Sequence, residues 1–482
     1  NESRITAVPT GDDAGRSEGL SLLIVDEAAH IQGFDELWMG LYSTVSTGGN
    51  IILLSCVTKD TFVFTDKGPK EVSAFIPPGN LPGDYILDSP YAIQGNQKNR
   101  SGNLWHNQGV VKTKKIKTAL GSLQGSYLHK VWATTQDGSR GWKEFRELQP
   151  GDWIAHHGGQ ELWGSNDTLK QQPISSLKRR NKLTQTDKIT PDLAYFLGLF
   201  IAEGNVRKDG NGKKVGATIT CGDDISGVIT SLGLSFSKTD SVHYNIGSDH
   251  LVRVMSSLGF ELDRKASHKI IPSRLMEMSR DNIVALLQGI FDGDGTIHKT
   301  TGSVSLTSTS LRLIEQVRVL LSNFGIWSNY EEIPKNKLNS YKSVRNEHNH
   351  ANHKLDINGK DALAFCKKIG FRLSRKQERV ARLEKANLHR ASSHDLVPFS
   401  FELAKRIILE AGLTQKEIAS LGLLNVHGHR KYKSSHLSRQ TMMRLLEYAE
   451  PRLSELTKEE LSGVVSSHLR WSRIKEIQES EA

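Results

Sequence analysis

The chain has 482 residues, a formal net charge of +10 and only three cysteines. This length is enough for three or four domains. No apolar run reaches membrane-spanning length and no secretory signal opens the chain, which argues against membrane and secreted proteins. Cys56, Cys221 and Cys366 lie too far apart in the sequence for a disulfide framework or a zinc site, so we expect a reducing cytoplasm.

The charge is unevenly distributed. The first 55 residues hold two basic and eight acidic side chains, and the remainder carries an excess of 16 basic ones. This excess suits a polyanionic partner, although basic side chains also serve simply as a solvated surface. The chain begins with Asn rather than Met, and we therefore expect it to be a piece of a longer protein.

Residues 1–55 contain two apolar segments that predict strands, LLIVDEAAH at 22–30 and IILLS at 51–55. With GRSEGLS at 15–21, they resemble the large terminase subunit of tailed phages, a P-loop ATPase that packages DNA. The resemblance implies that Asp26 holds Mg²⁺ and that Glu27 orients the attacking water. On its own, an apolar strand followed by two acids also fits an ordinary buried strand. No GxxxxGK[ST] loop is present, so this segment cannot by itself bind ATP in the manner of that family.

The sequence pattern changes at Cys56. Residues 56–68, CVTKDTFVFTDKG, predict a strand of alternating polar and apolar residues followed by a turn. This segment resembles the first block of an intein. The resemblance implies that the Cys56 thiol attacks the preceding carbonyl and forms a thioester. The alternative is an ordinary buried thiol.

Short strands are predicted at 110–113, 126–132, 142–145 and 148–154. Ser126 and His129 have the spacing of the intein TxxH motif, with Ser in place of Thr. In that motif His129 would protonate or polarise the scissile amide, supported by the Ser126 hydroxyl. The implied fold is an all-β Hint domain over residues 56–185. A polar stretch from Leu169 to Lys188 indicates a linker.

Two similar motifs follow, FLGLFIAEG at 196–204 and LQGIFDGDG at 287–295. Their alignment pairs Glu203 with Asp294. Each predicts a helix whose small residues permit close helix packing and whose last turn presents a carboxylate. Two such helices side by side would place both carboxylates at one end, where they could hold Mg²⁺. Either motif alone would fit a buried helix that stops at glycine.

The similarity extends beyond the motifs, because residues 244–260 match residues 355–371. The second repeat has gained about 20 residues, which correspond to the basic, His-rich stretch from Lys335 to Lys354. Each repeat is therefore predicted as an αββαββα-like half. Residues 186–385 resemble the single-chain LAGLIDADG, or DOD-type, homing endonucleases. The resemblance implies an α+β fold whose strands form a saddle in the DNA major groove.

The same resemblance implies the site. Glu203 and Asp294 would each ligate metal and direct a water, and Lys269 of the KIIP segment would activate water or stabilise the phosphorane. Lys269 could instead be a surface lysine. The hydroxyls at 307–310 would contact phosphate or cap the next helix. Histidines 348, 350 and 353 fit a DNA-facing loop better than a metal site, because no Cys or Asp flanks them. The candidate DNA-binding residues are Lys335, Lys337, Lys342, Arg345, Lys376 and Arg439.

Residues 390–455 predict a small helical subdomain. LTQKEIA at 413–419, with Thr414 as N-cap, and LSRQTMMRL at 437–445 resemble the two helices of a helix-turn-helix. The basic segment between them is longer than the usual turn, which leaves a plain helical spacer as the alternative. Residues 456–482 are predicted to begin the return to the Hint domain, with a strand at 471–477. The closing His-Asn of inteins is absent from this sequence, so we expect incomplete autoprocessing.

The sequence thus predicts a multidomain protein: a partial P-loop ATPase (1–55), an all-β Hint domain, an α+β endonuclease and a helical subdomain. The predicted function is a Mg²⁺-dependent, site-specific double-strand DNA homing endonuclease within an intein of a phage terminase. The expected partners are double-stranded DNA and the terminase extein, with no membrane, and the nuclease would be monomeric in a bacterial or phage-infected cytoplasm. One alternative is a decayed element that only binds DNA. A second alternative concerns the host gene, whose product would be an ATP-driven DNA-packaging motor.

Overall fold

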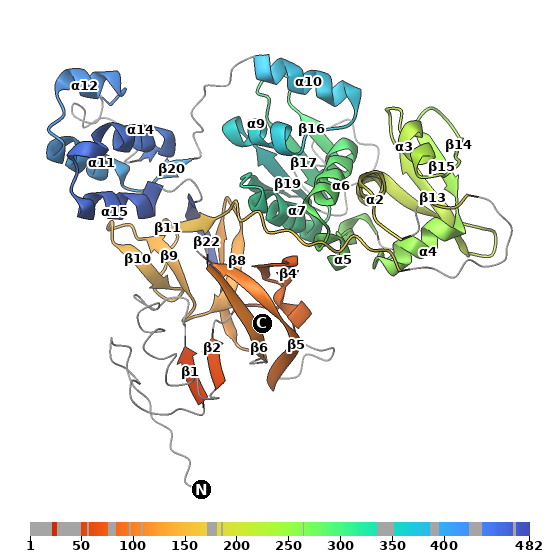
Figure 1. Cartoon of the computed structure of the whole chain (residues 1–482), viewed down its shortest axis with the longest axis horizontal. Coiled ribbons are helices and arrows are strands. Elements are labelled where there is room, and N and C mark those ends of the chain that lie inside the picture. The colour runs from red at the N-terminus through yellow and green to blue at the C-terminus, as the bar shows by residue number, and fades with distance from the viewer. Residues whose placement is uncertain are drawn as a thin grey trace, which may run out of the picture.

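The computed structural model describes residues 22–26, 50–54, 57–75, 83–95, 98–107, 109–170, 181–184, 187–263, 265–334, 351–385, 395–423, 436–465 and 469–482. These residues form a β-sheet module (57–170 with 469–482), a two-repeat module (181–385) and a helical module (395–465). Figure 1 shows the helical module and the two-repeat module side by side above the β-sheet module. No helix in the described ranges is long and apolar enough to cross a membrane.

Each repeat of the two-repeat module folds as αββαββα. The first consists of α2 (Pro191–Glu203), β12 (Gly204–Lys208), β13 (Lys214–Thr220), α3 (Ser226–Ser231), β14 (Ser237–Lys238), β15 (His243–Gly247) and α4 (Asp249–Ser257). The second consists of α6 (Arg280–Gly293), β16 (Gly295–Ile297), β17 (Val304–Ser308), α7 (Leu311–Asn323), β18 (Asn329–Ile333), β19 (Asn352–Ile357) and α9 (Gly359–Lys368). The predicted order of elements is therefore present in both halves. Between the halves lie η3 (Ala266–His268) and α5 (Ser273–Met276), and α10 (Ser374–Lys385) follows α9.

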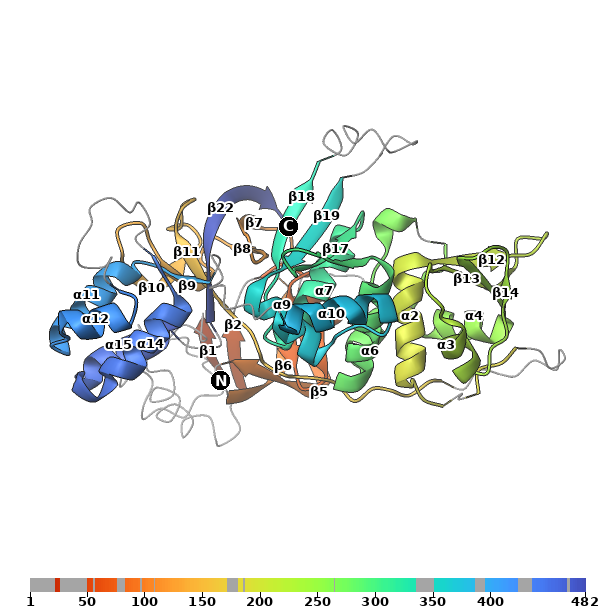
Figure 2. The same cartoon turned by 90° about the horizontal axis from the view of Figure 1, so that it is seen from above.

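The two four-stranded sheets have the same topology, β12-β13-β15-β14 and β16-β17-β19-β18. Figure 2 shows α2 and α6 side by side between them. The inward-facing residues of both sheets and the buried faces of the helices form one continuous core across the repeats. The residues gained by the second repeat fall between β18 and β19, and residues 335–350 of that insertion lie outside the described part of the chain.

The β-sheet module contains a six-stranded sheet in the order β10-β9-β11-β22-β7-β8. Its strands are β7 (Lys112–Thr118), β8 (Ser122–Ser126), β9 (Lys130–Thr134), β10 (Arg140–Glu144), β11 (Trp153–His157) and β22 (Leu469–Glu481). A second sheet, β4-β3-β5-β6, is built from β3 (Phe62–Thr65), β4 (Gly68–Glu71), β5 (Gly83–Gly95) and β6 (Lys98–Asn107), with η2 (Val72–Phe75) after β4.

The strand predicted at 471–477 is the centre of β22, which runs antiparallel to both β11 and β7. One sheet is thus completed by segments separated by about 300 residues of sequence. Opposite charges face each other along the β7–β22 pair, with Lys117 3.2 Å from Glu476 and Lys114 3.7 Å from Glu479. Such cross-strand pairs favour this register over a slipped one.

The segment predicted as a strand over 126–132 is broken. β8 ends at Ser126, residues 127–129 form a turn, and β9 begins at Lys130. The His129 amide donates to the Ser126 carbonyl over 3.1 Å, which closes the turn. Ser126 and His129 therefore lie at a turn between neighbouring strands rather than within one strand.

The polar stretch from 169 to 188 is anchored at both ends, which differs from a plain linker. Leu169 and Leu183 are buried in the core of the two-repeat module. The Leu183 amide also donates to His250 Nδ1 over 3.2 Å. Burial of these two leucine side chains removes apolar surface from water and so stabilises the attachment of an otherwise polar segment. Residues 171–180 and 185–186 lie outside the described ranges.

The helical module packs α11 (Ser400–Glu410), α12 (Gln415–Ser420), α14 (Arg439–Ala449) and α15 (Glu455–Val465) around their own core, with η4 (Glu450–Arg452) between α14 and α15. The strands β20 (Leu396–Val397) and β21 (Leu437–Ser438) pair beside them. Thr414 is the predicted N-cap of α12 and forms a capping box with Glu417. Because α15 belongs to this core, the return to the β-sheet module begins after residue 465 and not at 456. The basic segment 424–435 lies outside the described ranges.

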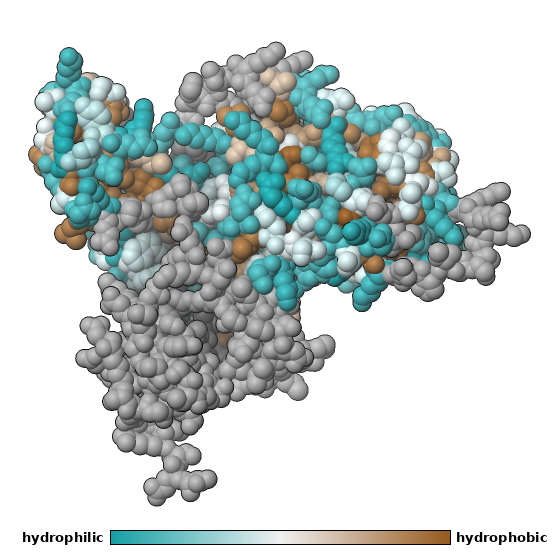
Figure 3. All heavy atoms as spheres, in the orientation of Figure 1, coloured by the Kyte–Doolittle hydropathy of each residue, from teal (hydrophilic) through white to brown (hydrophobic). Residues whose placement is uncertain are grey.

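The first 55 residues contribute two described strands, β1 (Leu22–Asp26) and β2 (Asn50–Leu54), at the predicted positions. The two strands pair in parallel. Asp26 is the last residue of β1, and Glu27 lies outside the described residues. On the face seen in Figure 3, hydrophilic residues cover much of the two-repeat and helical modules, and hydrophobic residues form scattered patches.

Candidate active site at the paired helices

The two motif helices approach each other at their glycines. A Cβ placed on Gly198 would collide with the Leu286 carbonyl oxygen, and a Cβ on Gly289 would collide with the Tyr195 carbonyl oxygen. The backbones of α2 and α6 therefore touch where side chains would otherwise separate them. This close approach follows from the small residues at helix-packing positions of both motifs.

The crossing places the two predicted carboxylates together. Glu203 is the last residue of α2, and Asp294 caps the C-terminus of α6 one position after the helix ends. Burial, together with the negative charge of Glu203 and a hydrogen bond from the protonated Asp294 to the Glu203 carboxylate, raises the pKa of Asp294 to about 7. The nearby ammonium of Lys269 acts in the opposite direction. The raised pKa of Asp294 shows that a second negative charge beside Glu203 is unfavourable, and a divalent cation bound by both carboxylates would offset this repulsion.

Lys269 also reaches this end of the helices, since its ammonium donates to the Ala202 carbonyl beside Glu203. The segment that carries it is held by α7. Ser310 Oγ donates to the Lys269 carbonyl over 2.6 Å, and the Gln316 amide bonds both the N–H and the carbonyl of Ile271 at 2.7 Å. Ser310 also accepts from Leu313 N and caps α7, so the capping alternative for this hydroxyl is confirmed.

Asp292 lies two residues before Asp294 but has another role. Its Oδ2 accepts from the Tyr195 hydroxyl at 2.9 Å and from the backbone N–H groups of Arg372 and Leu373 at 2.8 and 3.2 Å. The side chain is only 3% exposed, and burial raises its pKa. Asp292 therefore joins α2, α6 and the segment before α10.

The expected surface role of Lys376 is wrong. This lysine is 3% exposed, and its ammonium donates to the carbonyls of Phe291, Asp292 and Gly295 at 2.6 to 2.8 Å. It satisfies carbonyls that the end of α6 leaves unpaired. Lys269 does the same at the end of α2, so the two lysines occupy corresponding places in the two repeats.

Arg439 is also buried, which contradicts its expected contact with DNA. It is 3% exposed, and its Nε lies 2.8 Å from Asp395 Oδ1. The remaining candidates for DNA contact, Lys335, Lys337, Lys342 and Arg345, lie outside the described residues. Arg439 is the first residue of α14, and the sequence of this helix does not indicate that its side chain is buried.

Elsewhere, the turn that carries Ser126 and His129 meets the start of the β-sheet module. Val57 forms an isolated antiparallel bridge with Gly125, the residue before Ser126. His129 is buried and packs edge-on against Phe145, with 5.0 Å between ring centroids. Cys56 itself lies outside the described residues.

Two carboxylates offer hard oxygen ligands, and phosphate and water oxygens could complete the shell of a divalent cation. The described residues contain no cluster of three or more His, Cys, Asp or Glu side chains arranged to hold a metal. The donor set thus fits an ion held jointly by protein and substrate.

Comparison with known families agrees with this geometry. The LAGLIDADG-like domain family matches residues 281–370, a segment that begins in α6 and ends just after α9. The chain contains a LAGLIDADG-like domain. The match covers the second repeat, and the first repeat has the same αββαββα order of elements.

Solved LAGLIDADG structures are similar to the chain over part of its length. I-DmoI in complex with DNA and Mn shares 17% identity, covers 37% of this chain and 96% of its own, and has a TM-score of 0.28. The N-terminal LAGLIDADG domain of DUF199/WhiA shares 16% identity, covers 39% and 86%, and has a TM-score of 0.25. The assignment of the LAGLIDADG-like domain depends on the family match and not on these superpositions.

The curated proteins that are similar to this chain have functions unrelated to one another according to their names. A probable translation initiation factor IF-2 of Methanocaldococcus jannaschii is 27% identical over 189 residues, which are 39% of this chain. The corresponding factor of Thermococcus kodakarensis is 25% identical over 401 residues, 80% of the chain. A DNA polymerase of Thermococcus litoralis is 27% identical over 248 residues, 48% of the chain. The matched segments span only 15%, 32% and 14% of these relatives.

Proposed function

We propose that the two-repeat module is a divalent-metal-dependent endonuclease that hydrolyses one phosphodiester in each strand of a specific DNA site. The observation that carries the proposal is the proximity of Glu203 and Asp294 at the contact between α2 and α6, where burial and the charge of Glu203 raise the pKa of Asp294 to about 7. In this proposal both carboxylates would hold Mg²⁺, which supplies Lewis-acid activation of water and phosphate. Lys269 would add positive charge near the phosphate.

One chain supplies both carboxylates, so a monomer would suffice. The faces of the two sheets that point away from the core would lie in the major groove and read base edges. The net charge of +10 favours a polyanion.

The test is cleavage of a plasmid that carries the uninterrupted terminase junction, in the presence of Mg²⁺. We expect a site-specific double-strand cut that is lost in the Glu203→Gln and Asp294→Asn variants. The matched control is Asp281→Asn, which changes an exposed acid in the first turn of the same helix α6 and should cut like the parent. If Asp294→Asn cuts as well as the parent, the assignment of the site is wrong.

A retained gel shift without cutting would favour the alternative function, a decayed element that binds DNA and no longer cleaves it. Intact acids in both motifs and the titration of Asp294 near neutrality weigh against that alternative.

We further propose that this nuclease is nested in an intein inserted between Ser55 and Cys56 of a terminase large subunit. Three observations support this context. The six-stranded sheet is completed by β22, so the two-repeat and helical modules are an insertion within one sheet. The segments shared with initiation factors and a DNA polymerase span only 14 to 32% of those relatives, as expected for a mobile insert. Val57 lies beside the turn that carries Ser126 and His129.

In this context Cys56 would form the thioester with the Ser55 carbonyl, His129 would assist at the scissile amide, and a reducing cytoplasm would keep the thiol available. Added dithiothreitol should release a fragment of residues 1–55 from the folded protein. Cys56→Ala should abolish the release, whereas Cys366→Ala should leave it unchanged. A folded parent that releases no fragment would contradict the thioester chemistry.

A further inference from the structure

One side chain of helix α7, Arg312, contacts the part of the β-sheet module that directly follows Cys56 in the sequence. Its Nη2 donates to the Asp60 carbonyl over 3.2 Å and lies 2.5 Å from Glu71 Oε1. Its Cζ lies 4.6 Å from the centroid of the Phe62 ring. All three contacts cross the boundary between the two-repeat module and the β-sheet module.

Two of these partners lie at the open end of the β3–β4 hairpin. Phe62 is the first residue of β3, Glu71 is the last residue of β4, and the two face each other across the strand pair. The Arg312 and Glu71 side chains are only 26% and 28% exposed. Because ion pairs and cation–aromatic contacts are stronger when they are partly shielded from water, this contact holds the end of the hairpin against α7.

The guanidinium is also fixed from its own side of the boundary. Its Nη1 lies 3.1 Å from Glu315 Oε2, which is three residues further along α7. The helix is anchored in turn, because Ser310 caps it and donates to the Lys269 carbonyl. Arg312 therefore ties the start of the β-sheet module to a fixed part of the two-repeat module.

The segment from residue 57 to residue 61 is short, and its other end is tied to β8. The Thr58 amide donates to the Gln124 carbonyl over 3.1 Å, and the Thr61 amide donates to the Thr58 carbonyl over 3.0 Å, which closes a turn. Gln124 belongs to β8, which leads directly into the turn of the SxxH segment. A displacement at the hairpin end therefore changes how the residues next to Cys56 lie against that turn.

We propose that Arg312 is a positioning residue for the thioester step, so that the two-repeat module completes the splicing site. The inference rests on the proposed chemistry at Cys56. In that step Cys56 Sγ bonds to the Ser55 carbonyl carbon, the peptide C–N bond between the two residues breaks, and the thiol proton passes to the freed amino group of Cys56. The attack requires a short distance and a correct angle, and a misplacement of about 1 Å can slow such a step by about 100-fold.

The test is the release of residues 1–55 from the full chain by saturating dithiothreitol, which takes the acyl group from the Cys56 thioester. At saturation the rate of release reports thioester formation. We expect Arg312→Met to release the fragment at least about tenfold more slowly than the parent. Arg312→Lys should have an intermediate rate, because lysine keeps the charge but loses the planar contact with Phe62 and the second donor. An Arg312→Met rate equal to that of the parent would overturn the proposal.

Two substitutions separate the contact across the boundary from the helix that carries it. Glu71→Gln removes the partner of Arg312 in the β-sheet module and should slow release as Arg312→Met does. Glu315→Gln is the matched control, because it removes the partner on α7 and leaves the contacts across the boundary in place; it should release at the parent rate. Equal slowing by Glu315→Gln would assign the effect to α7 as a whole and would contradict the proposal.

DNA cleavage distinguishes positioning from general damage. Arg312→Met should cut the plasmid of the cleavage assay as the parent does, and its near-UV circular dichroism should match that of the parent. Loss of cutting and of release together would indicate that α7 is displaced and would overturn the positioning role. A folded parent that releases no fragment would contradict the chemistry at Cys56 and the inference that rests on it, whereas parent-like release by Arg312→Met would overturn the inference alone.

Hydrogen exchange measures the contact independently of the chemistry. The amides of residues 58–61 should exchange at least about tenfold faster in Arg312→Met than in the parent, because the hairpin end loses its contact with α7. Glu315→Gln should exchange like the parent over the same residues. Unchanged exchange in Arg312→Met would indicate that β8 alone fixes the segment and would overturn the proposal.

Discussion

Neighbouring acids of the second motif have separate roles because their surroundings differ. Asp292 points into the core and accepts three hydrogen bonds from Tyr195, Arg372 and Leu373. Asp294 lies at the helix end beside Glu203, where burial and the like charge raise its pKa to about 7. Aspartate is thus a hydrogen-bond acceptor that holds the fold together at position 292, and a candidate metal ligand with a raised pKa at position 294.

Asp294 should make stability depend on pH. Its folded pKa lies above its ordinary value of 3.8, so between about pH 4 and pH 7 the folded state holds a proton that the unfolded state has lost. Stability therefore falls as the pH rises through this window, by about 2 to 4 kcal/mol at most. Asp294→Asn should remove this loss, so that it melts above the parent at pH 8 and close to it below pH 4.

The measurement is thermal unfolding of parent and variant between pH 3.5 and pH 8 in EDTA. Asp281→Asn should track the parent throughout. A difference in melting temperature between Asp294→Asn and the parent that does not change with pH would contradict the raised pKa of Asp294. In place of EDTA, Mg²⁺ at pH 8 should raise the melting temperature of the parent and of Asp281→Asn but not that of Asp294→Asn.

Substitution of Lys376 should lower the stability of the protein more than substitution of an exposed lysine. Its three bonds to the carbonyls of Phe291, Asp292 and Gly295 are lost in Lys376→Met, which should destabilise the protein by about 2 to 3 kcal/mol. Lys360→Met changes an exposed lysine of the same module and should cost less than about 0.5 kcal/mol. Chemical denaturation of both variants measures the difference, and equal losses would indicate that the buried bonds contribute little.

At the scale of elements, the contact between α2 and α6 decides the site. Gly198 and Gly289 let the two backbones touch, and this contact fixes how Glu203 and Asp294 face each other. Helix α7 then holds the Lys269 segment through Ser310 and Gln316. The site thus depends on three helices and not on the two motifs alone.

Gly198→Ala tests this contact. The added methyl group would collide with the Leu286 carbonyl, so the helices must separate, with a loss of about 1 to 3 kcal/mol and a marked fall in DNA cleavage. Gly227→Ala is the matched control, because this helical glycine of α3 has open space around it and should gain up to about 1 kcal/mol. Thermal unfolding and a cleavage assay check both, and wild-type behaviour of Gly198→Ala would contradict the packing account.

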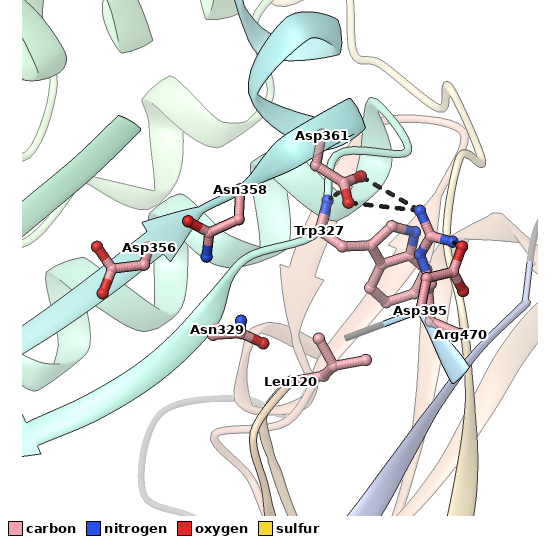
Figure 4. A pocket seen from close by; sticks show the side chains of 8 residues that line it. All are labelled: Leu120, Trp327, Asn329, Asp356, Asn358, Asp361, Asp395 and Arg470. Atoms are coloured by element: carbon pink, nitrogen blue, oxygen red, sulfur yellow. Dashed lines mark hydrogen bonds and ion pairs between the residues drawn. The ribbon is translucent and has the colours of Figure 1, made fainter. Parts of the chain in front are cut away.

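For the whole molecule, Arg470 of β22 joins three modules. Its guanidinium bonds Asp361 in the first turn of α9 and Asp395 beside the helical module, and Asp395 also pairs with Arg439 of α14. Figure 4 shows Asp361, Arg470 and Asp395 converging around a small pocket next to Trp327. The Trp327 amide donates to Asp361 as well, over 3.1 Å. Alternating charges therefore hold the modules together where each is largely shielded from water.

Arg470→Gln should be severe, because it leaves Asp361, whose side chain is 12% exposed, without its cation, and leaves Asp395, at 16%, with Arg439 as its remaining cation. We expect a loss of about 3 to 5 kcal/mol and faster proteolysis of the folded chain. Arg452→Gln breaks an exposed pair with Glu417 and should cost less than about 1 kcal/mol. Limited proteolysis with mass spectrometry measures the effect, and parent-like resistance of Arg470→Gln would exclude this junction as a clamp.

The sequence by itself determined the repeat, the pairing of Glu203 with Asp294 and the αββαββα order, since these follow from short-range periodicity and from similarity between segments of one chain. It also located the cap at Thr414 and the final strand. Only the tertiary structure decided which charged residues are exposed. Lys376 and Arg439 are of residue types that usually lie at the surface, but both are buried and bind buried acceptor oxygens. The broken strand at Ser126–His129 and the packing of α15 were likewise decided there, because each depends on contacts with other parts of the fold.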